Sequence, residues 1–416
     1  MSSSRTVEVV VVGAGPAGVA AALTLHRGGA DVLVVDKARF PRDKTCGDGL
    51  TTLALRELER LGFDPAAVDS WQDVRRAFLH APSGRIVTLP LPQGPGTFSA
   101  VVPRRELDAA LVELAVTSGV AVEQGAPLVS ASPGEDDLGA RLGIDGLGEV
   151  RARWVIGADG MWSPLRRLRG HQEDGYRGEW HAFRQYVRDT GPGSRDLHVW
   201  FEPDLLPGYV WSFPLPDGRA NIGFGVVRGA HLDGGALARL WPELLTRPAI
   251  RRVLGPRAEP ESPHRAWPIP AGIGRATLAD GDVLYVGDAA RAADVLTGEG
   301  IGQALLSGRL AAEAILASRQ VPSGPDAGER YRHAVLHELG PDDRMATVLN
   351  RLLSRRGPAE AAIRTVGLSS WTRRQFARWL FEDSPRGIAL TPRRWHRGAL
   401  SGPPSFPDRS RPPALR

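Results

Sequence analysis

Thiols and ammonium groups are almost absent from this chain of 416 residues. Cys46 is the single cysteine, which excludes an internal disulfide. Lys37 and Lys44 are the two lysines, and the remaining Lys/Arg positions are all arginine. No apolar run approaches the roughly 18–20 residues of a membrane-spanning helix, and no segment has the layout of a signal peptide. The sequence therefore predicts a cytoplasmic protein, with peripheral membrane association as the alternative.

Positive charge is concentrated late in the chain. The net charge is +5, yet residues 341–416 hold fifteen arginines against six acidic side chains, or +9. The apolar share of 42% and the charged share of 24% are ordinary for a globular protein. We expect the basic end to be a solvated helical surface. Contact of these helices with phosphates, an acidic partner or anionic lipid is the alternative.

Apolar runs alternate with glycine turns in an order typical of an α/β protein. Residues 7–12 predict a strand, 16–27 a helix and 32–35 a second strand, which together make a parallel βαβ unit. Further helices are expected over 52–61 and 105–117, and helical segments follow residue 331. Short strands are expected over 74–100, an antiparallel sheet over 181–225 and another strand over 283–286.

The first turn of this order carries a Gly-x-Gly-x-x-Gly motif, at Gly13, Gly15 and Gly18. The first glycine permits the tight turn, the second lets the backbone approach a pyrophosphate, and the third lets helix and strand pack closely. The helix N-terminus supplies free N–H groups for the phosphates. Asp36 closes the next strand and is placed to accept hydrogen bonds from ribose hydroxyls. The motif indicates a dinucleotide site but does not distinguish NAD from FAD.

Three further motifs give the chain a family resemblance. They are GADGMWSPLR (157–166), GD at Gly287 and Asp288, and R-x-x-L-D at Arg104, Leu107 and Asp108. In this order the chain resembles the flavoproteins built like p-hydroxybenzoate hydroxylase. The resemblance implies FAD, with Asp288 at its ribityl or ribose part and Asp159 supporting the pocket. It also implies that the helix beginning near 298–302 points at the flavin, where its N-terminus would stabilise the negative charge of the reduced ring.

The resemblance implies a Rossmann-type FAD-binding domain with an inserted antiparallel β-sheet substrate domain. We place the FAD-binding domain at 1–72, 100–172 and 275–330, and the substrate domain at 73–99 and 173–274. A C-terminal helical region over 331–400 and a disordered tail over 401–416 complete the chain. The predicted cofactor-binding residues are Gly13, Gly15, Pro16, Ala17, Gly18, Asp36, Lys37, Arg42, Cys46, Gly47, Arg104, Asp159, Gly287, Asp288, Gly298, Gly300 and Ile301.

Two other stretches resemble the geranylgeranyl reductase family. FPRDKTCGDGL (40–50) contains its R-x-K-x-C-G-x-G element, and PGYVWSFPLPDG (207–218) contains its P-x-Y-x-W-x-F-P element. LTGEGI (296–301) matches the family's loop after the GD motif, although Asp294-Val295 replaces the usual Asn/Asp-Pro pair. The resemblance implies reduction of C=C bonds in an isoprenoid or other apolar substrate. The predicted substrate-binding residues are Gly49, Tyr209, Trp211, Phe213, Pro214 and Val295.

The lone thiol has a place in such a reaction. Reducing an isolated C=C bond needs a hydride from the flavin and a proton for the other carbon, and a thiol tuned by basic neighbours such as Arg42 and Lys44 can give that proton. A small buried hydrophobe is the alternative for Cys46. Tyr209, Trp211 and Phe213 alternate along a strand and so share one face, which suits an apolar substrate or, alternatively, core packing. Cys46, Tyr209 and Trp211 are the predicted catalytic residues.

Several other functions were weighed. A monooxygenase that hydroxylates or epoxidises a natural-product scaffold through a flavin C4a-hydroperoxide would use the same pocket, and a non-catalytic prenyl-binding protein would share the fold. No second Gly-x-Gly-x-x-Gly follows a strand, so we expect NAD(P)H to bind transiently as reductant, or electrons to come from a carrier. No metal site is expected, because His333 and His337 lack further ligands. No nucleic-acid module is recognisable, and a monomer or dimer is expected.

Overall fold

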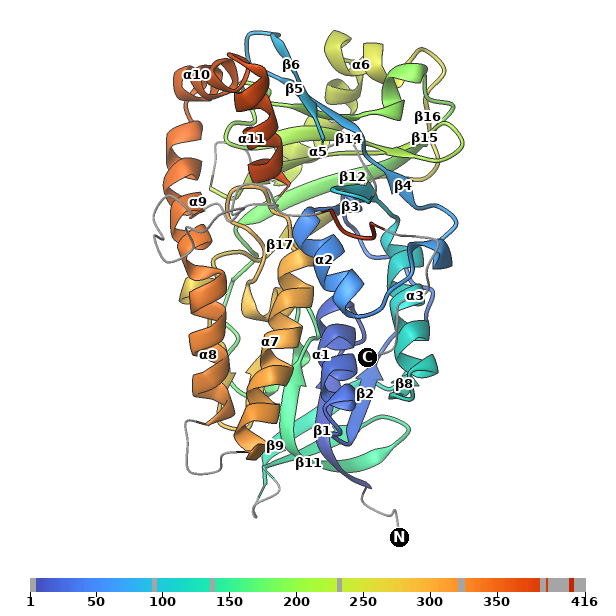
Figure 1. Ribbon diagram of the computed structural model, residues 1–416, viewed down its shortest axis with the longest axis vertical. Helices are drawn as coiled ribbons and strands as arrows, with labels where there is room; N and C mark the ends of the chain where they lie inside the picture. Colours follow the sequence, from blue (N-terminus) through green and yellow to red (C-terminus); the bar gives the residue numbers. More distant parts are fainter. Residues whose placement is uncertain are drawn as a thin grey trace.

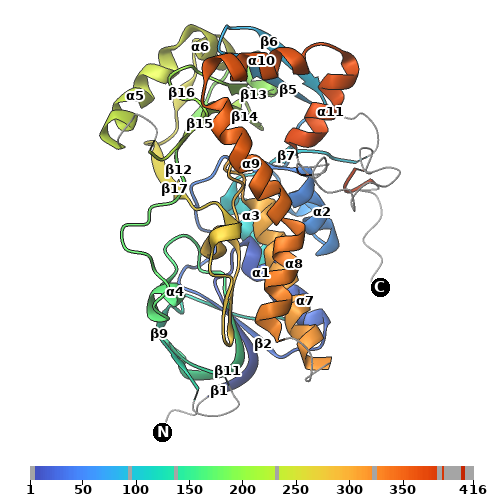
Figure 2. The same ribbon diagram turned by 90° about the vertical axis from the view of Figure 1, so that its left-hand side faces the viewer.

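Two sheets lie toward opposite ends of the long axis of the molecule (Figure 1). In the computed structural model, residues 5–91, 96–134, 139–229, 234–320, 326–381, 387 and 404–407 are described. The sheet that contains the N-terminal strand lies at one end, with helices of the first and last thirds of the chain against it. The second sheet lies at the other end, and a column of late helices runs along one side of both (Figure 2). The alternation of strands and helices makes a mixed α/β fold.

The first sheet is mainly parallel, in the order β18-β19-β11-β1-β2-β8, with β10 and β9 continuing antiparallel from β11. Its central strand β1 carries Val9, Val10, Val11 and Val12, all buried, as expected for a strand covered on both faces. Its strands are β1 (Arg5–Val12), β2 (Val32–Asp36), β8 (Ala121–Gln124), β9 (Leu128–Pro133), β10 (Ala140–Ile144), β11 (Gly148–Gly157), β18 (Ala279–Asp280) and β19 (Val283–Tyr285).

Two helices pack closely beside this sheet. Helix α1 (Pro16–Arg27) begins with proline, whose fixed φ suits the first helical position. Helix α7 (Ile301–Gln320) lies against α1, and at Gly308 an added Cβ would come within 2.1 Å of the Ala17 carbonyl oxygen. Glycine is therefore required for the two helices to approach this closely. Other helices of this half are α2 (Thr52–Arg60), α3 (Arg104–Thr117) and α4 (Pro164–Leu168).

The second sheet is antiparallel except for the pair β13 and β5, in the order β16-β12-β15-β14-β13-β5-β6, with β17 also on β12. Helices α5 (Gly234–Thr246) and α6 (Pro248–Leu254) accompany it. Its strands are β5 (Arg76–His80), β6 (Ile86–Pro90), β12 (Trp180–Arg188), β13 (Leu197–Trp200), β14 (Tyr209–Leu215), β15 (Arg219–Val227), β16 (Glu259–Pro260) and β17 (Arg265–Ile269). A small sheet of β3 (Gly49–Leu50), β7 (Ala100–Val101) and β4 (Gln72–Asp73) lies at the junction of the two halves.

Four consecutive helices form the column beside the sheets: α8 (Ala327–Glu338), α9 (Gly340–Leu353), α10 (Arg356–Val366) and α11 (Ser370–Leu380). Their inner faces are apolar. Ala346, Leu349 and Leu353 of α9 and Trp379 of α11 belong to a cluster with Trp180 and Tyr209 of the second sheet and with Val295, which precedes α7. The rest of the predicted helical region, 382–386 and 388–400, lies outside the described residues.

The predicted disorder of the tail differs from the structure at residues 404–407. Ser405 pairs with Thr97 in a β-bridge, and Phe406 is 8% exposed in the core of the first half. The Phe406 ring lies edge-on to Trp71, with ring centroids 6.1 Å apart. Composition gave no sign of this anchor, because a single aromatic in a Pro- and Arg-rich tail is outweighed by its neighbours. Residues 401–403 and 408–416 lie outside the described residues.

Candidate active site

A cavity of about 410 Å³ lies between the two sheets, within the usual range of ligand sites. Most of the predicted site residues line it, although they come from segments spread over about 290 positions of the chain. Three do not: Gly18, Pro214 and Val295. Those that line it are Gly13, Gly15, Pro16, Ala17, Asp36, Lys37, Arg42, Cys46, Gly47, Gly49, Arg104, Asp159, Tyr209, Trp211, Phe213, Gly287, Asp288, Gly298, Gly300 and Ile301.

The first glycine turn is shaped for close approach of a phosphate. Gly13 has φ +108°, and an added Cβ would lie 2.3 Å from the Ala158 carbonyl oxygen. At Gly15 the nearest atom to an added Cβ is Arg42 Nη2 at 3.7 Å, so the cavity side of this residue is open. Gly18 instead faces the turn itself, where a Cβ would come within 1.8 Å of the Gly13 carbonyl oxygen. Its role is packing of α1 on β1.

Asp36 ends β2 beside this turn. Its two carboxylate oxygens accept hydrogen bonds from the Ala14 and Ala38 backbone amides, each at 2.7 Å. Each oxygen retains a lone pair that can accept a hydroxyl. The carboxylate therefore both fixes the glycine turn and lines the cavity where the ribose of a dinucleotide is expected.

Asp159 and Asp288 line the middle of the cavity. Asp159 Oδ2 accepts from the Leu165 backbone amide at 2.9 Å, whereas its Oδ1 is buried without a hydrogen-bond partner. Burial raises the pKa of this carboxyl. Asp288 Oδ2 lies 3.7 Å from Lys44 Nζ. Because buried acceptors are nearly always satisfied, the unpartnered Oδ1 indicates a donor from a bound group, such as a hydroxyl of a dinucleotide.

The loop between Asp288 and α7 is organised by Asp294. Its Oδ1 accepts from the Leu296 and Thr297 backbone amides, at 3.0 and 2.7 Å. Gly298 has φ +70°, α7 starts at Ile301, and Gly298, Gly300 and Ile301 line the cavity, so the N-terminus of the helix lies beside it. Val295 does not line it; its carbonyl accepts from Trp180 Nε1 and Asn350 Nδ2, both at 2.9 Å. Replacement of the family's Pro at this position therefore leaves a loop fixed by side chains.

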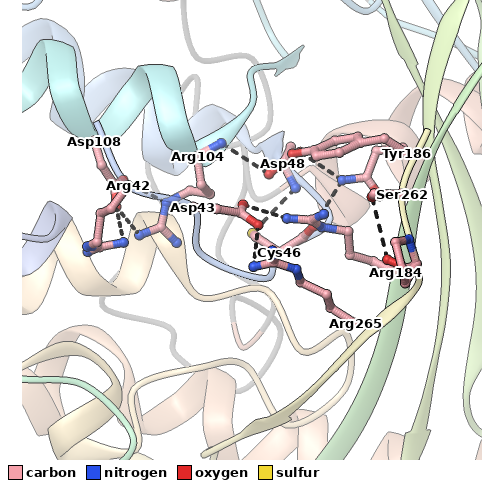
Figure 3. A network of polar contacts seen from close by, with 12 residues as sticks. Arg42, Asp43, Cys46, Asp48, Arg104, Asp108, Arg184, Tyr186, Ser262 and Arg265 are labelled. Carbon is pink, nitrogen blue, oxygen red and sulfur yellow. Dashed lines mark hydrogen bonds and ion pairs between the residues drawn. The ribbon is translucent and has the colours of Figure 1, made fainter. Parts of the chain in front are cut away.

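The turn that carries Cys46 lies between the halves (Figure 3). Cys46 lines the cavity, and its Sγ accepts from the Asp48 backbone amide at 3.3 Å. Asp48 has φ +68°, is fully buried and accepts from Tyr186 Oη at 2.6 Å and Asn221 Nδ2 at 2.7 Å. Asn221 Nδ2 also donates to the Cys46 carbonyl at 2.9 Å. Strands β12 and β15 of the substrate sheet therefore hold a turn that belongs in sequence to the FAD-binding half.

The other end of the same turn is held by ion pairs. Asp43 lies 2.7 Å from Arg184 Nη2 and 2.8 Å from Arg265 Nη1, so one carboxylate joins β12 and β17 to the turn (Figure 3). Arg42 Nη1 lies 3.1 Å from Asp108, which also forms a bidentate pair with Arg104. The R-x-x-L-D motif thus anchors the turn from α3.

Burial dominates the protonation of the turn. It raises the pKa of Cys46 to about 11, with Arg104 acting in the opposite sense, so the thiol is protonated at neutral pH. Burial also lowers the pKa of Lys44 to about 8. Arg42 and Lys44 were expected to tune the thiol, but the stronger basic influence on its pKa comes from Arg104 of α3. At neutral pH the site therefore contains a protonated thiol and not a thiolate.

An aromatic wall faces this turn from β14. An added Cβ at Gly47 would lie 3.3 Å from the Phe213 ring and 3.5 Å from Trp211, and at Gly223 of β15 it would lie 2.2 Å from Trp211. The indole is therefore enclosed between the turn and the sheet, and its Nε1 donates to Asn221 Oδ1 at 3.1 Å. Tyr209 Oη donates to the Thr297 carbonyl. Pro214, next in the motif, is buried away from the cavity.

Several residues of the site were missing from the sequence-based prediction. Arg184, Tyr186, Asn221 and Trp267 come from strands without a recognised motif, and Lys44 Nζ lies 3.7 Å from the centre of the Trp267 ring. Asp43 and Asp48 stand inside the recognised cysteine motif, Asp43 between two basic residues and Asp48 between two glycines, and this placement was the one available signal. Among the described residues, no group of three or more His, Cys, Asp or Glu side chains is arranged to hold a metal.

The residues fit FAD. The open glycine turn, the Asp36 carboxylate, the unpartnered Asp159 oxygen and the N-terminus of α7 lie along one continuous cavity. The same cavity continues to the cysteine turn and to the aromatic wall.

Comparisons with known proteins agree with this geometry. A family model described as an FAD binding domain matches residues 6–317. The menaquinone reductase of Mycolicibacterium smegmatis is 36% identical over 324 residues, which cover 74% of this chain and 75% of that protein. Digeranylgeranylglycerophospholipid reductase 2 of Methanopyrus kandleri is 33% identical over 358 residues, covering 83% and 86%.

Solved structures share the fold at lower identity. A geranylgeranyl bacteriochlorophyll reductase-like protein of Thermoplasma acidophilum superposes with a TM-score of 0.78 at 21% identity, covering 94% of this chain and 100% of that one. The p-nitrophenol 4-monooxygenase of Pseudomonas putida gives 0.69 at 18% identity, covering 90% and 97%. Together with the matched relatives, the motifs and the cavity establish that the chain is an FAD-dependent oxidoreductase of the geranylgeranyl reductase family.

Proposed function

We propose that this protein reduces C=C bonds of an isoprenoid chain, on a lipid or a quinone. The observation that carries the proposal is one cavity shared by a dinucleotide cradle, a protonated thiol and an aromatic wall. The relatives that match over three quarters of the chain are named as reductases of menaquinone and of a digeranylgeranyl phospholipid. Both of those substrates carry unsaturated isoprenoid chains.

The cavity residues have separate roles in this reaction. Bound and reduced FAD supplies the hydride for one alkene carbon. Trp211, Phe213 and Tyr209 offer apolar ring surface that excludes water and orients a flat, apolar chain. Cys46 gives the proton to the other carbon: its S–H bond breaks, a C–H bond forms and the electron pair remains on Sγ. Water then returns a proton to the thiolate, which completes the balance of two hydrogens added per double bond.

The reductant is proposed to be NAD(P)H that binds transiently, or a protein electron carrier. The support is the single Gly-x-Gly-x-x-Gly motif of the chain, which FAD occupies. Stopped-flow reduction of the yellow protein by NADH, NADPH or a reduced ferredoxin-type carrier identifies the donor by which one bleaches the flavin.

We propose that the late helices contact a membrane peripherally, and that the protein takes its apolar substrate from there. Val348 and Leu352 of α9 are 63% and 52% exposed, and Leu368 and Trp371 at the α10–α11 turn are 73% and 59% exposed. Exposed arginines stand among them, at 344, 351, 355, 364 and 374. Exposed apolar side chains with basic neighbours suit an anionic bilayer surface. In the described residues, no helix is both long and apolar enough to cross a membrane.

Product mass tests the activity directly. Holoprotein reduced with dithionite under anaerobic conditions is incubated with menaquinone or a geranylgeranyl-bearing phospholipid in detergent. We expect the product to gain two hydrogens per reduced double bond. Gain of one oxygen after admission of air would instead indicate a monooxygenase, and purified protein that binds prenyl lipid without flavin would indicate a carrier. Either result contradicts the proposal.

A further inference from the structure

We propose that Asp48 is a positioning residue for the Cys46 thiol: its carboxylate, fixed by the substrate sheet, holds the turn in which its own backbone N–H meets Sγ. The inference rests on the proposed proton-donor function of Cys46 and assigns a role to a residue outside the recognised motif positions. Figure 3 shows Asp48 beside Cys46, with Tyr186 and Arg104 reaching it from opposite sides.

The backbone of Asp48 is in a conformation that needs support. Its φ of +68° is uncommon for a residue with a side chain, and asparagine and aspartate tolerate it best. Its carboxylate accepts from three donors on three elements: the Arg104 backbone amide of α3 at 3.2 Å, Tyr186 Oη of β12 and Asn221 Nδ2 of β15. Its carbonyl accepts from the Val102 amide at 2.9 Å. The residue is thus fixed on all sides, and with it the N–H that points at Sγ.

The fixed turn is also tied to the aromatic wall. Asn221 accepts from Trp211 Nε1 and donates to both Asp48 and the Cys46 carbonyl. One amide side chain therefore joins the indole that faces the substrate to the residue that donates the proton. A shift of Asp48 would change the distance between thiol and substrate as well as the thiol's own hydrogen bond.

Asp48 acts on the thiol in two opposing ways. Its N–H stabilises a thiolate, whereas its negative charge disfavours one, and the charge has the larger effect on the pKa of Cys46. The other charged groups around Sγ are Arg104 of α3, Glu299 of the loop before α7 and Lys44 of the turn itself. Burial raises the pKa of Asp48 to about 6, so the carboxylate is ionised above that pH and keeps the thiol protonated.

The single cysteine makes this measurable without turnover. In FAD-loaded protein, the rate at which iodoacetamide alkylates the Cys46 peptide is followed by mass spectrometry from pH 7 to pH 11, because amines such as Lys44 also react at high pH. Asp48→Asn keeps the N–H and a side chain suited to positive φ but removes the charge. We expect its thiol midpoint to fall by about half a pKa unit or more, so that alkylation below the midpoint is about threefold faster or more. Tyr186→Phe removes one donor from the carboxylate but leaves Asp48 ionised near the thiol midpoint, so we expect it to move that midpoint much less than Asp48→Asn does.

Asp43→Asn is the matched control, since it removes a carboxylate of the same turn whose charge is neutralised by Arg184 and Arg265. We expect its alkylation profile to match that of the unaltered protein within twofold. In turnover, Asp48→Asn should lower kcat more than it changes KM. A profile for Asp48→Asn that superposes on that of the parent, or an equal shift in Asp43→Asn, overturns the proposal. Full activity of Cys46→Ala would instead remove the proton-donor function while leaving the alkylation result intact.

Discussion

The two halves of the cavity are built by different means. The FAD-binding half relies on backbone: glycine turns at 13, 15, 287 and 298 and the N-termini of α1 and α7. The substrate half relies on side chains that converge from separate strands, such as Arg184, Asn221 and Trp211. Backbone geometry can be met only by a few residue types at fixed spacing, whereas side chains can converge from many positions. The FAD-binding half is therefore recognisable in the sequence as complete motifs, whereas the substrate half is recognisable only in part.

We expect the largest effect from substitution of a glycine in the FAD-binding half. Gly13→Ala forces a side chain into φ +108° and toward the Ala158 carbonyl, 2.3 Å away. We expect the free energy of unfolding to fall by about 3 kcal/mol or more and purified protein to lose its flavin. Gly218→Ala in the β14–β15 turn is the control, because φ is +69° there but the nearest atom is 3.9 Å away. It should cost about 1 kcal/mol and leave the protein yellow; equal losses in both variants would contradict the contrast between the halves.

Lys44 belongs to both halves, since it lies near Asp288 of one and over Trp267 of the other. Its pKa is about 8 when folded and 10.5 when free, so the unfolded chain binds more protons between these values. The contribution of Lys44 to stability should therefore rise with pH across this window, by an amount of the order of 3 kcal/mol relative to a variant without the ammonium group. Urea unfolding with FAD in fixed excess measures it. Lys44→Met should remove the rise, and a parent protein that weakens steadily from pH 8 to pH 10.5 relative to that variant would contradict the sign.

Substitution of Cys46 shows whether turnover depends on a side chain whose turn is held by the substrate sheet. Cys46→Ala should remain folded and yellow, because the glycine turns and the Asp36 carboxylate that fit FAD are unchanged, and turnover with reduced flavin should fall by about 100-fold. Cys46→Ser keeps a proton on a group of similar size and should retain more activity than alanine. Unchanged turnover in Cys46→Ala would show that the thiol only fills space in the structure.

Asp288 contributes a side chain to the FAD-binding half, which otherwise relies on its backbone. Asp288→Ala should weaken FAD binding by about tenfold, the scale of one charge-assisted hydrogen bond. Fluorescence titration of apoprotein with FAD gives the affinity. Asp280→Ala, which alters the Arg169 and His171 contacts of β18 outside the cavity, is the control and should leave the affinity within twofold. Loss of FAD affinity in both variants would show general loosening of the half.

The smallest effect is expected at the outer face of the helices. Replacing Leu368 and Trp371 together with serine removes exposed apolar surface and should lower sedimentation with phosphatidylglycerol vesicles by about threefold, without changing flavin content. Val116 and Val129, exposed on the FAD-binding half, provide a control pair for the same substitution. Identical vesicle binding in both double variants would exclude the late helices as the docking face.

More of the FAD-binding half than of the substrate half could be predicted from the sequence, because backbone requirements leave recognisable motifs and converging side chains do not. The strand, turn and helix from Val7 to Arg27 were predicted within a residue or two, because a buried parallel strand needs an unbroken apolar run and a phosphate turn needs glycine. The lone thiol was placed in the cavity by the same kind of local pattern. Asn221 and Tyr186 were not, because only the register of β12, β14 and β15 brings them to Asp48. Burial, which dominates the pKa of Cys46, is likewise a property of the folded chain.

The anchor at Ser405 and Phe406 bears on how the protein is made. Trp71, Thr97 and Glu59 leave the ribosome early, yet Phe406, whose amide donates to Glu59 at 3.0 Å, emerges after every helix of the column. The corner of the FAD-binding half around α2 therefore stays open to solvent throughout synthesis and closes only when residues 404–407 arrive. Loss of residues 404–407 would remove the bridge of Ser405 to Thr97 and the contact of Phe406 with Trp71, and would expose the apolar side chains of this corner.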